Sequence, residues 1–208
     1  MLLALACVFA PGFGHAEDQP VKIVVLGDSL VAGYGIPAED AFPAKLDKAL
    51  KAKGIAATVV NAGVSGDTAS GGFDRVDWSV PQGTDAVIVE LGANDMLRGI
   101  DPKITKTALE KILDRLAARH ISVLLAGMKA AHNMGSDYSK AFDAIYPALA
   151  STHSLVFYPF FLDGVATDAK LNQIDGIHPT AAGIDVIVSR ILPQVEALIA
   201  RVREARGS

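Results

Sequence analysis

The sequence predicts an α/β protein: a three-layer α/β/α sandwich built on a five-stranded parallel sheet. Two observations predict this class. Five short apolar runs of strand type occur along the chain, and segments with helical spacing of apolar residues separate them. Neighbouring parallel strands need long right-handed crossovers, so the helices must cover both faces of the sheet. We expect the flavodoxin-like strand order 2-1-3-4-5, in which the first three strands are adjacent.

The first three strands are predicted from apolar runs that end abruptly. Residues 21–26 form the first run, and residues 58–61 and 86–91 repeat its pattern. Each run is of the kind that is buried on both faces of a sheet. Small and polar residues follow each run at once, which indicates a loop at the carboxyl end of the strand. We therefore expect three loops to converge at one edge of the sheet.

Two helices and the last two strands follow the same alternation. Residues 42–54 carry apolar residues at helical spacing, and a glycine closes the segment. Asp101 and Pro102 open the next helix as its N-cap and first residue. Strands are predicted at residues 121–127 and 155–158, which brings the predicted sheet to five strands.

The C-terminal half contains two further helical patterns, each interrupted by proline. One covers residues 138–150, where Pro147 is expected to kink or end the helix. The other runs from beyond Pro179 to near the chain end, with a bend at Pro193. Trp78 is expected to be a partly buried packing residue.

Composition limits the kinds of partner. The chain has 208 residues, half of them hydrophobic, and a formal net charge of -4 without a block of like charges. This length suits one domain with a full core. The absence of a basic stripe argues against nucleic acid or an anionic membrane surface as the main partner, and favours a small substrate. The sequence does not indicate the oligomeric state.

The N-terminal stretch differs from the rest. Residues 1–16 are uncharged and apolar, and they end in small residues that fit signal-peptide cleavage after Ala16. The usual basic segment is missing, so we expect that the natural start lies upstream or was trimmed. A short membrane anchor and a misread start are the alternatives to a signal peptide. The stretch is too short to span a bilayer, so no stable membrane insertion is expected. We expect a periplasmic or secreted single domain at residues 17–208. Such a mature chain lacks the only cysteine, Cys7, which excludes disulfides and a thiol nucleophile.

Three side chains suit nucleophilic catalysis. Ser29 follows the first strand directly, at the edge where open α/β sheets place their ligands. Asp175 stands three residues before His178, so its carboxylate can accept the Nδ1 hydrogen while Nε2 points outward. His178 can then act as a general base toward Ser29. Ser29 taken alone is more often a helix N-cap, and the Asp175–His178 pair reverses that preference.

An oxyanion hole can be built at the same edge. The candidate donors are the backbone N–H groups of Ser29 and Gly66 and the side-chain amide of Asn94. Gly66 lacks a Cβ and permits close approach of the backbone. These donors and the Ser-His-Asp set predict acyl transfer to water.

Four short motifs occur in order along the chain: Gly27-Asp28-Ser29-Leu30, Ser65-Gly66-Asp67-Thr68, Gly92-Ala93-Asn94-Asp95 and Asp175-Gly176-Ile177-His178-Pro179. Together they resemble the SGNH (GDSL) hydrolase family over about residues 21–195. The resemblance implies that Ser29, Asp175 and His178 are catalytic, and that Ser29, Gly66 and Asn94 are the oxyanion donors. It also implies hydrolysis of esters and thioesters of the arylesterase, thioesterase or lysophospholipase type. Ala93 departs from a glycine in this family's pattern, without disturbing Asn94.

Three alternatives remain at this point. A carbohydrate acetylesterase would use the same residues. A metal-dependent phosphohydrolase is conceivable because Asp28, Asn94, Asp175 and His178 can all bind metals, although such sites usually recruit several histidines. A binding protein could keep the fold without the reaction. We expect neither a metal nor another cofactor, and the carboxylates of Asp28 and Asp95 are expected to accept hydrogen bonds from loop N–H groups.

Apolar residues in the expected edge loops indicate the substrate. Together they favour an apolar acyl or aryl group on an ester or thioester over a sugar. Phe161 belongs to the same expected loops, as does the polar segment 128–135. The candidate substrate-binding residues are Leu30, Met96, Leu97, His132, Phe160 and Ile177.

Overall fold

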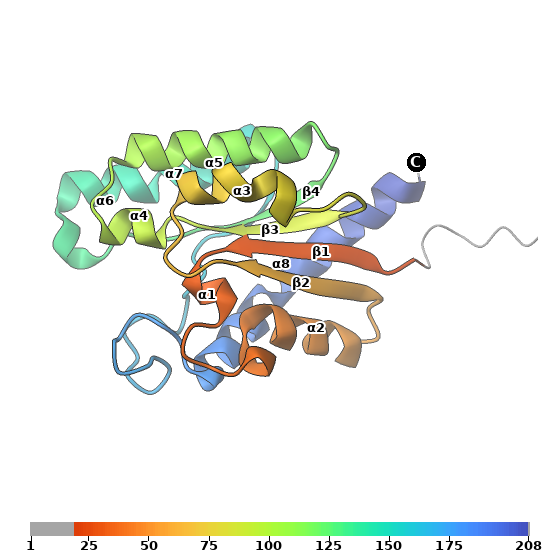
Figure 1. The fold of residues 1–208 in the computed structure, drawn as a ribbon, viewed down its shortest axis with the longest axis horizontal. Helices are drawn as coiled ribbons and strands as arrows, with labels where there is room; N and C mark the ends of the chain where they lie inside the picture. Colours follow the sequence, from red (N-terminus) through yellow and green to blue (C-terminus); the bar gives the residue numbers. More distant parts are fainter. Residues whose placement is uncertain (1–18, 208) are drawn as a thin grey trace, which may run out of the picture.

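The computed structural model describes residues 19–207, so the predicted signal peptide at residues 1–16 lies outside the described residues. A five-stranded sheet with order β2-β1-β3-β4-β5 forms the centre, and every neighbouring pair of strands is parallel (Figure 1). Both the class and the strand order predicted from sequence are confirmed. The strands are β1 (Val21–Gly27), β2 (Ala57–Gly63), β3 (Ala86–Glu90), β4 (Ser122–Ala126) and β5 (Val156–Tyr158).

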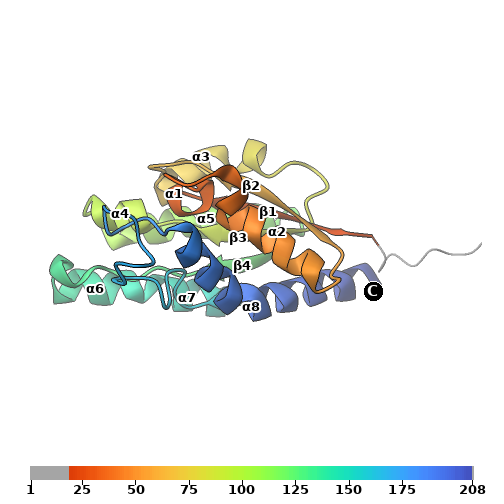
Figure 2. The same ribbon diagram turned by 90° about the horizontal axis from the view of Figure 1, so that it is seen from below.

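Helices cover both faces of the sheet (Figures 1 and 2). On one face, α2 (Phe42–Ala52) packs against α8 (Ala181–Gly207), and on the other α3 (Ala69–Ser79) packs against α5 (Pro102–Ala117). Shorter elements lie in the loops and crossovers. These are α1 (Ser29–Ala32), η2 (Ala38–Asp40), α4 (Ala93–Leu97), η3 (His132–Met134), α6 (Ser136–Asp143) and α7 (Ile145–Thr152).

The strand register brings the carboxyl ends of four strands to one level. Gly27 at the end of β1 pairs with Gly63 of β2 on one side and with Glu90 of β3 on the other. Glu90 in turn pairs with Ala126 of β4. The loops that follow these strands therefore begin side by side, which is the geometric condition for a shared site.

The second strand is less buried than its sequence predicts. The side chains of β3 are all buried, whereas β2 is an edge strand whose Val60 is half exposed. An apolar run cannot reveal whether its strand lies at the centre or at the edge, because edge strands can also carry β-branched residues.

Glycine and proline account for the differences in the helices. The sequence pattern misses α3, because Gly71 and Gly72 lie inside it. Gly72 is required by packing, since a Cβ there would lie 2.3 Å from Leu91 Cδ1. The predicted helix 138–150 is instead two helices that meet at Ala144. Pro147 sits in the first turn of α7, where a missing N–H costs little.

The last helix continues through its proline, since Pro193 lies inside α8, which is helical from Ala181 to Gly207. One further expectation needs correction. Trp78 is not a packing residue, because 72% of its surface is exposed on α3.

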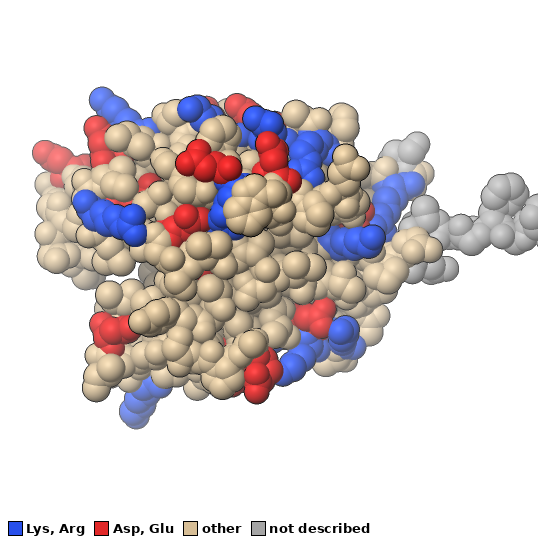
Figure 3. Space-filling model, viewed as in Figure 1, with Lys and Arg blue, Asp and Glu red and all other residues tan. Residues whose placement is uncertain are grey.

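The surface carries charges of both signs. Lys and Arg side chains alternate with Asp and Glu on the face in Figure 3 and form no stripe of one sign there. Within residues 19–207, none of the helices combines the length and the apolar character needed to cross a bilayer.

Candidate active site

Ser29 is placed by the turn from β1 into α1. Asp28 is the N-cap of α1, and its Oδ1 accepts a hydrogen bond of 3.0 Å from the backbone N–H of Leu30. This capping contact confirms the predicted role of the Asp28 carboxylate. Ser29 is the first helical residue and is buried except for 9% of its surface. Its hydroxyl is consequently held on a short rigid turn at the edge of the sheet.

His178 lies against Ser29, although 149 positions separate them in sequence. The distance from His178 Nε2 to Ser29 Oγ is 2.9 Å, and His178 Nδ1 lies 2.8 Å from Asp175 Oδ2. The acidic partner at Nδ1 favours the tautomer with hydrogen on Nδ1, which leaves Nε2 free to accept the Ser29 proton.

The carboxylate of Asp175 is fixed by its own loop. Its Oδ1 accepts backbone hydrogen bonds from Ile177 at 2.9 Å and from His178 at 3.0 Å. These bonds, followed by the bond to the His178 ring, lower the pKa of Asp175 to about 2. Asp175 therefore stays ionised beside His178 throughout the neutral range.

Two residues that the sequence analysis missed support the imidazole. The ring of Tyr34 lies against the ring of His178, with 4.6 Å between centroids. Gln173 Nε2 donates to the carbonyl oxygens of Tyr34 at 2.7 Å and Pro179 at 3.0 Å, and so joins the two loops. A Cβ at Gly35 would lie 2.2 Å from Gln173 Oε1, so this glycine makes room for the joining side chain.

The three predicted N–H donors lie in the segments that follow β1, β2 and β3 at the same edge of the sheet. The backbone N–H groups of Ser29 and Gly66 donate to no acceptor within residues 19–207. Gly66 has φ +84°, a left-handed conformation that suits glycine, and Arg98 Nη2 donates to its carbonyl oxygen at 2.6 Å. Asn94 Nδ2 donates to Asp28 Oδ2 at 3.0 Å, and this bond fixes the plane of the amide whose second N–H remains available.

Arg75 joins the strand ends beneath the donors and was also missed. Its side chain is almost fully buried. Nη2 donates to the carbonyl of Gly27 at 2.8 Å, Nη1 to that of Ala62 at 2.8 Å, and Nε to Asp67 Oδ2 at 2.6 Å. One guanidinium thus ties the ends of β1 and β2 to the loop that carries Gly66.

The third loop is anchored by Asp95. Its Oδ2 accepts from the backbone N–H of Ala69 at 2.8 Å, and its Oδ1 accepts from Thr105 Oγ1 at 3.0 Å. The prediction that this carboxylate serves loop N–H groups is confirmed. The loop of Asn94 is thereby attached to the start of α3.

Below Ser29 lie two adjacent buried carboxyl groups. Burial raises the pKa of Asp28 to about 6, although hydrogen bonds from Leu30 and Asn94 oppose the shift. Glu90 is completely buried at the end of β3, and burial, together with the charge of Asp28, raises its pKa well above the ordinary value. Both carboxyl groups therefore hold a proton to higher pH than exposed ones would.

A largely apolar cavity of about 470 Å³ opens beside Ser29 and His178. All six predicted substrate-binding residues lie in its wall, together with Met128 of the expected segment 128–135. Leu162 and Thr167 also line it, although the sequence did not indicate them. Phe161 does not belong to the wall. It is fully buried and packs edge-on against Phe42 with 5.0 Å between centroids, because alternate residues of this segment face opposite sides. The six predicted residues are Leu30, Met96, Leu97, His132, Phe160 and Ile177.

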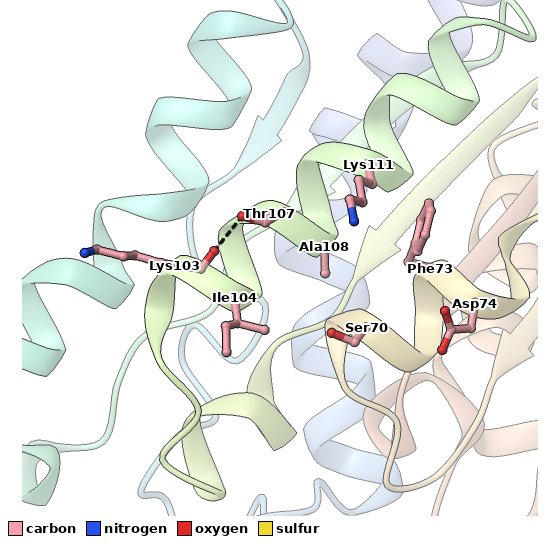
Figure 4. A pocket seen from close by; sticks show the side chains of 8 residues that line it. All are labelled: Ser70, Phe73, Asp74, Lys103, Ile104, Thr107, Ala108 and Lys111. Carbon is pink, nitrogen blue, oxygen red and sulfur yellow. Dashed lines mark hydrogen bonds between the residues drawn. The ribbon is translucent and has the colours of Figure 1, made fainter.

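A second cavity of about 400 Å³ lies between α3 and α5 (Figure 4). Phe73 of α3 and Lys111 of α5 meet across it, with the ammonium 5.4 Å from the ring centroid. Lys103 and Ile104 line its other end. Ser29, His178 and Asn94 do not line this cavity, so it is separate from the candidate site.

Metal-binding groups are not clustered in the part of the chain that the structure describes. Within residues 19–207, no three His, Cys, Asp or Glu side chains are grouped so that they could hold a metal ion. Both ring nitrogens of His178 are engaged, one by Asp175 and the other by Ser29.

Comparison with known proteins gives consistent matches over most of the chain. The model of the GDSL-like lipase/acylhydrolase family matches residues 25–186. An arylesterase from Vibrio mimicus is 38% identical over 179 residues, which are 86% of this chain and 88% of that protein. The thioesterase 1/protease 1/lysophospholipase L1 of Escherichia coli K12 is 38% identical over 178 residues, 85% of this chain and 84% of that one. The crystal structure of AlinE4, an SGNH-hydrolase family esterase, has TM-score 0.73 and 43% identity and covers 86% of this chain and 96% of its own.

Proposed function

The chain belongs to the GDSL-like lipase/acylhydrolase family and is a carboxylic ester hydrolase, and we propose that it cleaves esters and thioesters through an acyl-enzyme on Ser29. One observation carries the proposal. A buried serine hydroxyl lies 2.9 Å from an imidazole that is itself oriented by a carboxylate, at the mouth of an apolar cavity.

In the acylation step, Ser29 Oγ attacks the carbonyl carbon of the substrate while His178 Nε2 takes the hydroxyl proton. The carbonyl π electrons move to oxygen and form an oxyanion. The N–H groups of Ser29, Gly66 and Asn94 stabilise this charge, and Asp175 stabilises the imidazolium. The intermediate collapses, the bond to the leaving oxygen or sulfur breaks, and His178 returns its proton to the leaving group.

Deacylation repeats the sequence with water. His178 removes a proton from water, the hydroxide oxygen bonds to the acyl carbon, and the oxyanion forms again at the same donors. Collapse releases the carboxylic acid and returns the proton to Ser29. The bond between Asp175 and Nδ1 keeps the ring in the tautomer that both steps require.

The cavity favours an apolar acyl or aryl group. Its wall is formed mainly by leucine, isoleucine, methionine, alanine and phenylalanine side chains, whereas a sugar site needs several polar side chains that reach the ligand. Lys129 and Phe160 both line the wall, and the Lys129 ammonium lies 5.2 Å from the centroid of the Phe160 ring. A carbohydrate acetylesterase is accordingly the less favoured use of this site. Comparing p-nitrophenyl butyrate and octanoate with acetylated xylan separates the two.

The metal-dependent alternative conflicts with the bonding of His178. A metal would have to displace either Asp175 or Ser29 from the ring nitrogens. We expect ester hydrolysis to be unchanged after treatment with EDTA. Complete loss of activity that zinc or manganese restores would favour the phosphohydrolase.

The predicted signal peptide supports a periplasmic or secreted location for a mature domain at residues 17–208. N-terminal sequencing of the exported protein should give Glu17 as its first residue. Recovery of an uncut chain from the cytoplasm would contradict this location.

Replacement of Ser29 tests the proposal. Ser29→Ala should lower kcat for p-nitrophenyl butyrate by roughly 10⁴-fold or more, because only binding and the oxyanion donors would remain. Ser70→Ala, in the wall of the second cavity, is the matched control and should keep wild-type kcat. A fluorophosphonate probe should label the wild-type protein and the control but not Ser29→Ala. Hydrolysis by Ser29→Ala at the wild-type rate would exclude the acyl-enzyme.

A further inference from the structure

Glu90 is a buried acid to which the proposed reaction assigns no role. It ends β3 in the middle of the sheet and has no exposed surface. Its Oε2 lies 3.4 Å from the backbone N–H of Asp28, the residue before Ser29. A Cβ at Gly27 would lie 2.8 Å from the same oxygen, so the glycine leaves the space that the carboxyl occupies. Glu90 is thus fitted directly beneath the turn that carries the nucleophile.

The surroundings of Glu90 suit a neutral carboxylic acid. Its Oε1 is buried and has no hydrogen-bond partner within residues 19–207, and the one bond to Oε2 is long. An ionised carboxylate in that position would be desolvated without compensating donors, at high cost. Burial and the charge of Asp28 both raise the pKa of Glu90, in agreement with this geometry.

Asp28 links Glu90 to the donors of the site. Its Oδ2 holds the Asn94 amide at 3.0 Å, and its Oδ1 caps the helix that begins with Ser29. Other titratable groups also act on the pair. Tyr146 of α7 faces Glu90 and Asp28, while Asp67 of the loop before α3 and the His178 ring act on Asp28. Of these groups, Asp28 alone touches both Glu90 and an oxyanion donor.

We propose that Glu90 is a positioning residue that remains a neutral acid and fixes Asp28, so that Asp28 can orient Asn94 and the N–H of Ser29 toward the developing oxyanion. This inference rests on the proposed function. If Glu90 were ionised, its charge would repel Asp28 across the turn and loosen the contact on which Asn94 depends.

A double-mutant cycle tests whether Glu90 acts through Asn94. Glu90→Gln keeps shape and neutrality and should keep kcat within about threefold, whereas Glu90→Leu should lower kcat about tenfold or more at similar KM, because one buried anchoring contact is lost. In an Asn94→Ala background, Glu90→Leu should cost less than about threefold, since the donor that it positions is already absent. Equal losses in both backgrounds, or a Glu90→Gln loss as large as that of Glu90→Leu, would overturn the proposal.

Unfolding tests the neutral state and does not depend on catalysis. The unfolded chain releases the Glu90 proton above a pKa of about 4.3, whereas the native protein keeps it. Above about pH 5 the unfolding equilibrium constant of the wild type should therefore rise with pH relative to Glu90→Gln, by up to about tenfold per pH unit as long as the native protein keeps the proton. Asp28 is present in both proteins, so its own titration largely cancels. Parallel pH profiles would show that native Glu90 is ionised and would overturn the proposal even if Glu90→Leu fails to fold.

The two proposals can fail separately. Full activity in Ser29→Ala removes the acyl-enzyme, whatever the unfolding data show for Glu90. Activity that requires Ser29 but shows no coupling between Glu90 and Asn94 removes only the role of Glu90.

Discussion

The two cavities are similar in volume, about 470 Å³ beside Ser29 and about 400 Å³ between α3 and α5, yet they differ in what fixes their walls. In the first, the polar groups come from separate strand ends and are locked by one another. In the second, the polar groups come from two neighbouring helices. The Lys111 ammonium lies over the Phe73 ring, whereas the Lys103 side chain points away from the other labelled residues (Figure 4). Volume alone therefore does not distinguish a reactive site from a surface groove.

The difference lies in preorganisation. Each polar group beside Ser29 has a second partner that sets its direction: Asp175 for His178, Asp28 for Asn94, and Arg98 for the Gly66 peptide. In the groove, the one hydrogen bond drawn in Figure 4 joins Thr107 to the backbone of its own helix, at Lys103. Fixed donors can stabilise charge in a transition state because they need not reorganise. Within residues 19–207, the ammonium groups of Lys103 and Lys111 form no hydrogen bond that would fix them in the same way.

Among the residues around Ser29, the largest effect should come from an oxyanion donor of the first cavity. Asn94→Ala removes one oxyanion donor, and kcat for p-nitrophenyl butyrate should fall by roughly 10²-fold to 10³-fold with little change in KM. Asn133→Ala, an exposed asparagine in η3, is the control and should keep wild-type kcat. An unchanged kcat in Asn94→Ala would remove Asn94 from the set of donors.

The sequence predicts the polar groups of the first cavity well for a physical reason. Ser29 and Asn94 follow apolar runs directly, and parallel strands end at one edge, so their proximity follows from topology. Asp175 and His178 lie within one turn, and their contact depends only on local spacing. The strand register then sets the level at which the strands end, since Gly27 of β1 pairs with both Gly63 of β2 and Glu90 of β3.

The supporting residues could not be read from the pattern. Glu90 ends an apolar strand and Arg75 lies in an unpredicted helix, and nothing local shows that a charged residue type will be buried. The sequence around Gly72 does not indicate its role, which is to let α3 approach Leu91 closely. Tyr34 is half exposed, so hydrophobic spacing does not mark it, although it covers the His178 ring. Partners distant in sequence decide all four positions.

The pH dependence of stability should reveal the raised pKa of Asp28, the residue that precedes Ser29. Asp28 has a native pKa of about 6, whereas an unfolded Asp ionises near 3.8. The native state therefore holds its proton over a window in which the unfolded state has released it, and the free energy of unfolding should fall as pH rises from about 4 to 6. Relative to Asp28→Asn the fall should be about 3 kcal/mol, at 1.36 kcal/mol per unit. Chemical denaturation at several pH values measures it, and a constant difference between the proteins would contradict the raised pKa.

A large side chain placed in each cavity in turn should lower esterase activity only in the cavity beside Ser29. Ala131 is partly exposed in the wall of the first cavity. Ala131→Phe should lower kcat/KM for p-nitrophenyl octanoate by about tenfold or more, and should lower kcat/KM for p-nitrophenyl acetate less. Each methylene excluded from an apolar pocket costs roughly 1 kcal/mol or more. Thr107→Phe places the same ring in the groove and should leave both substrates unchanged. A uniform loss for both esters in Ala131→Phe would indicate that the acyl chain lies elsewhere.

The smallest effect should come from shortening a side chain in the wall of the second cavity. Lys111→Ala removes the ammonium above Phe73, a contact worth about 0.5–1 kcal/mol at an exposed site, so the free energy of unfolding should fall by no more than that. The kcat and KM for p-nitrophenyl butyrate should stay within about twofold of wild type, because α3 and α5 remain packed through their buried faces and the loops of Gly66 and Asn94 keep their anchors at Arg75 and Asp95. A kcat change comparable to that of Asn94→Ala would mean that the second cavity is coupled to the oxyanion donors. The contrast between polar groups that are fixed by partners and polar groups that are not would then no longer explain where catalysis occurs.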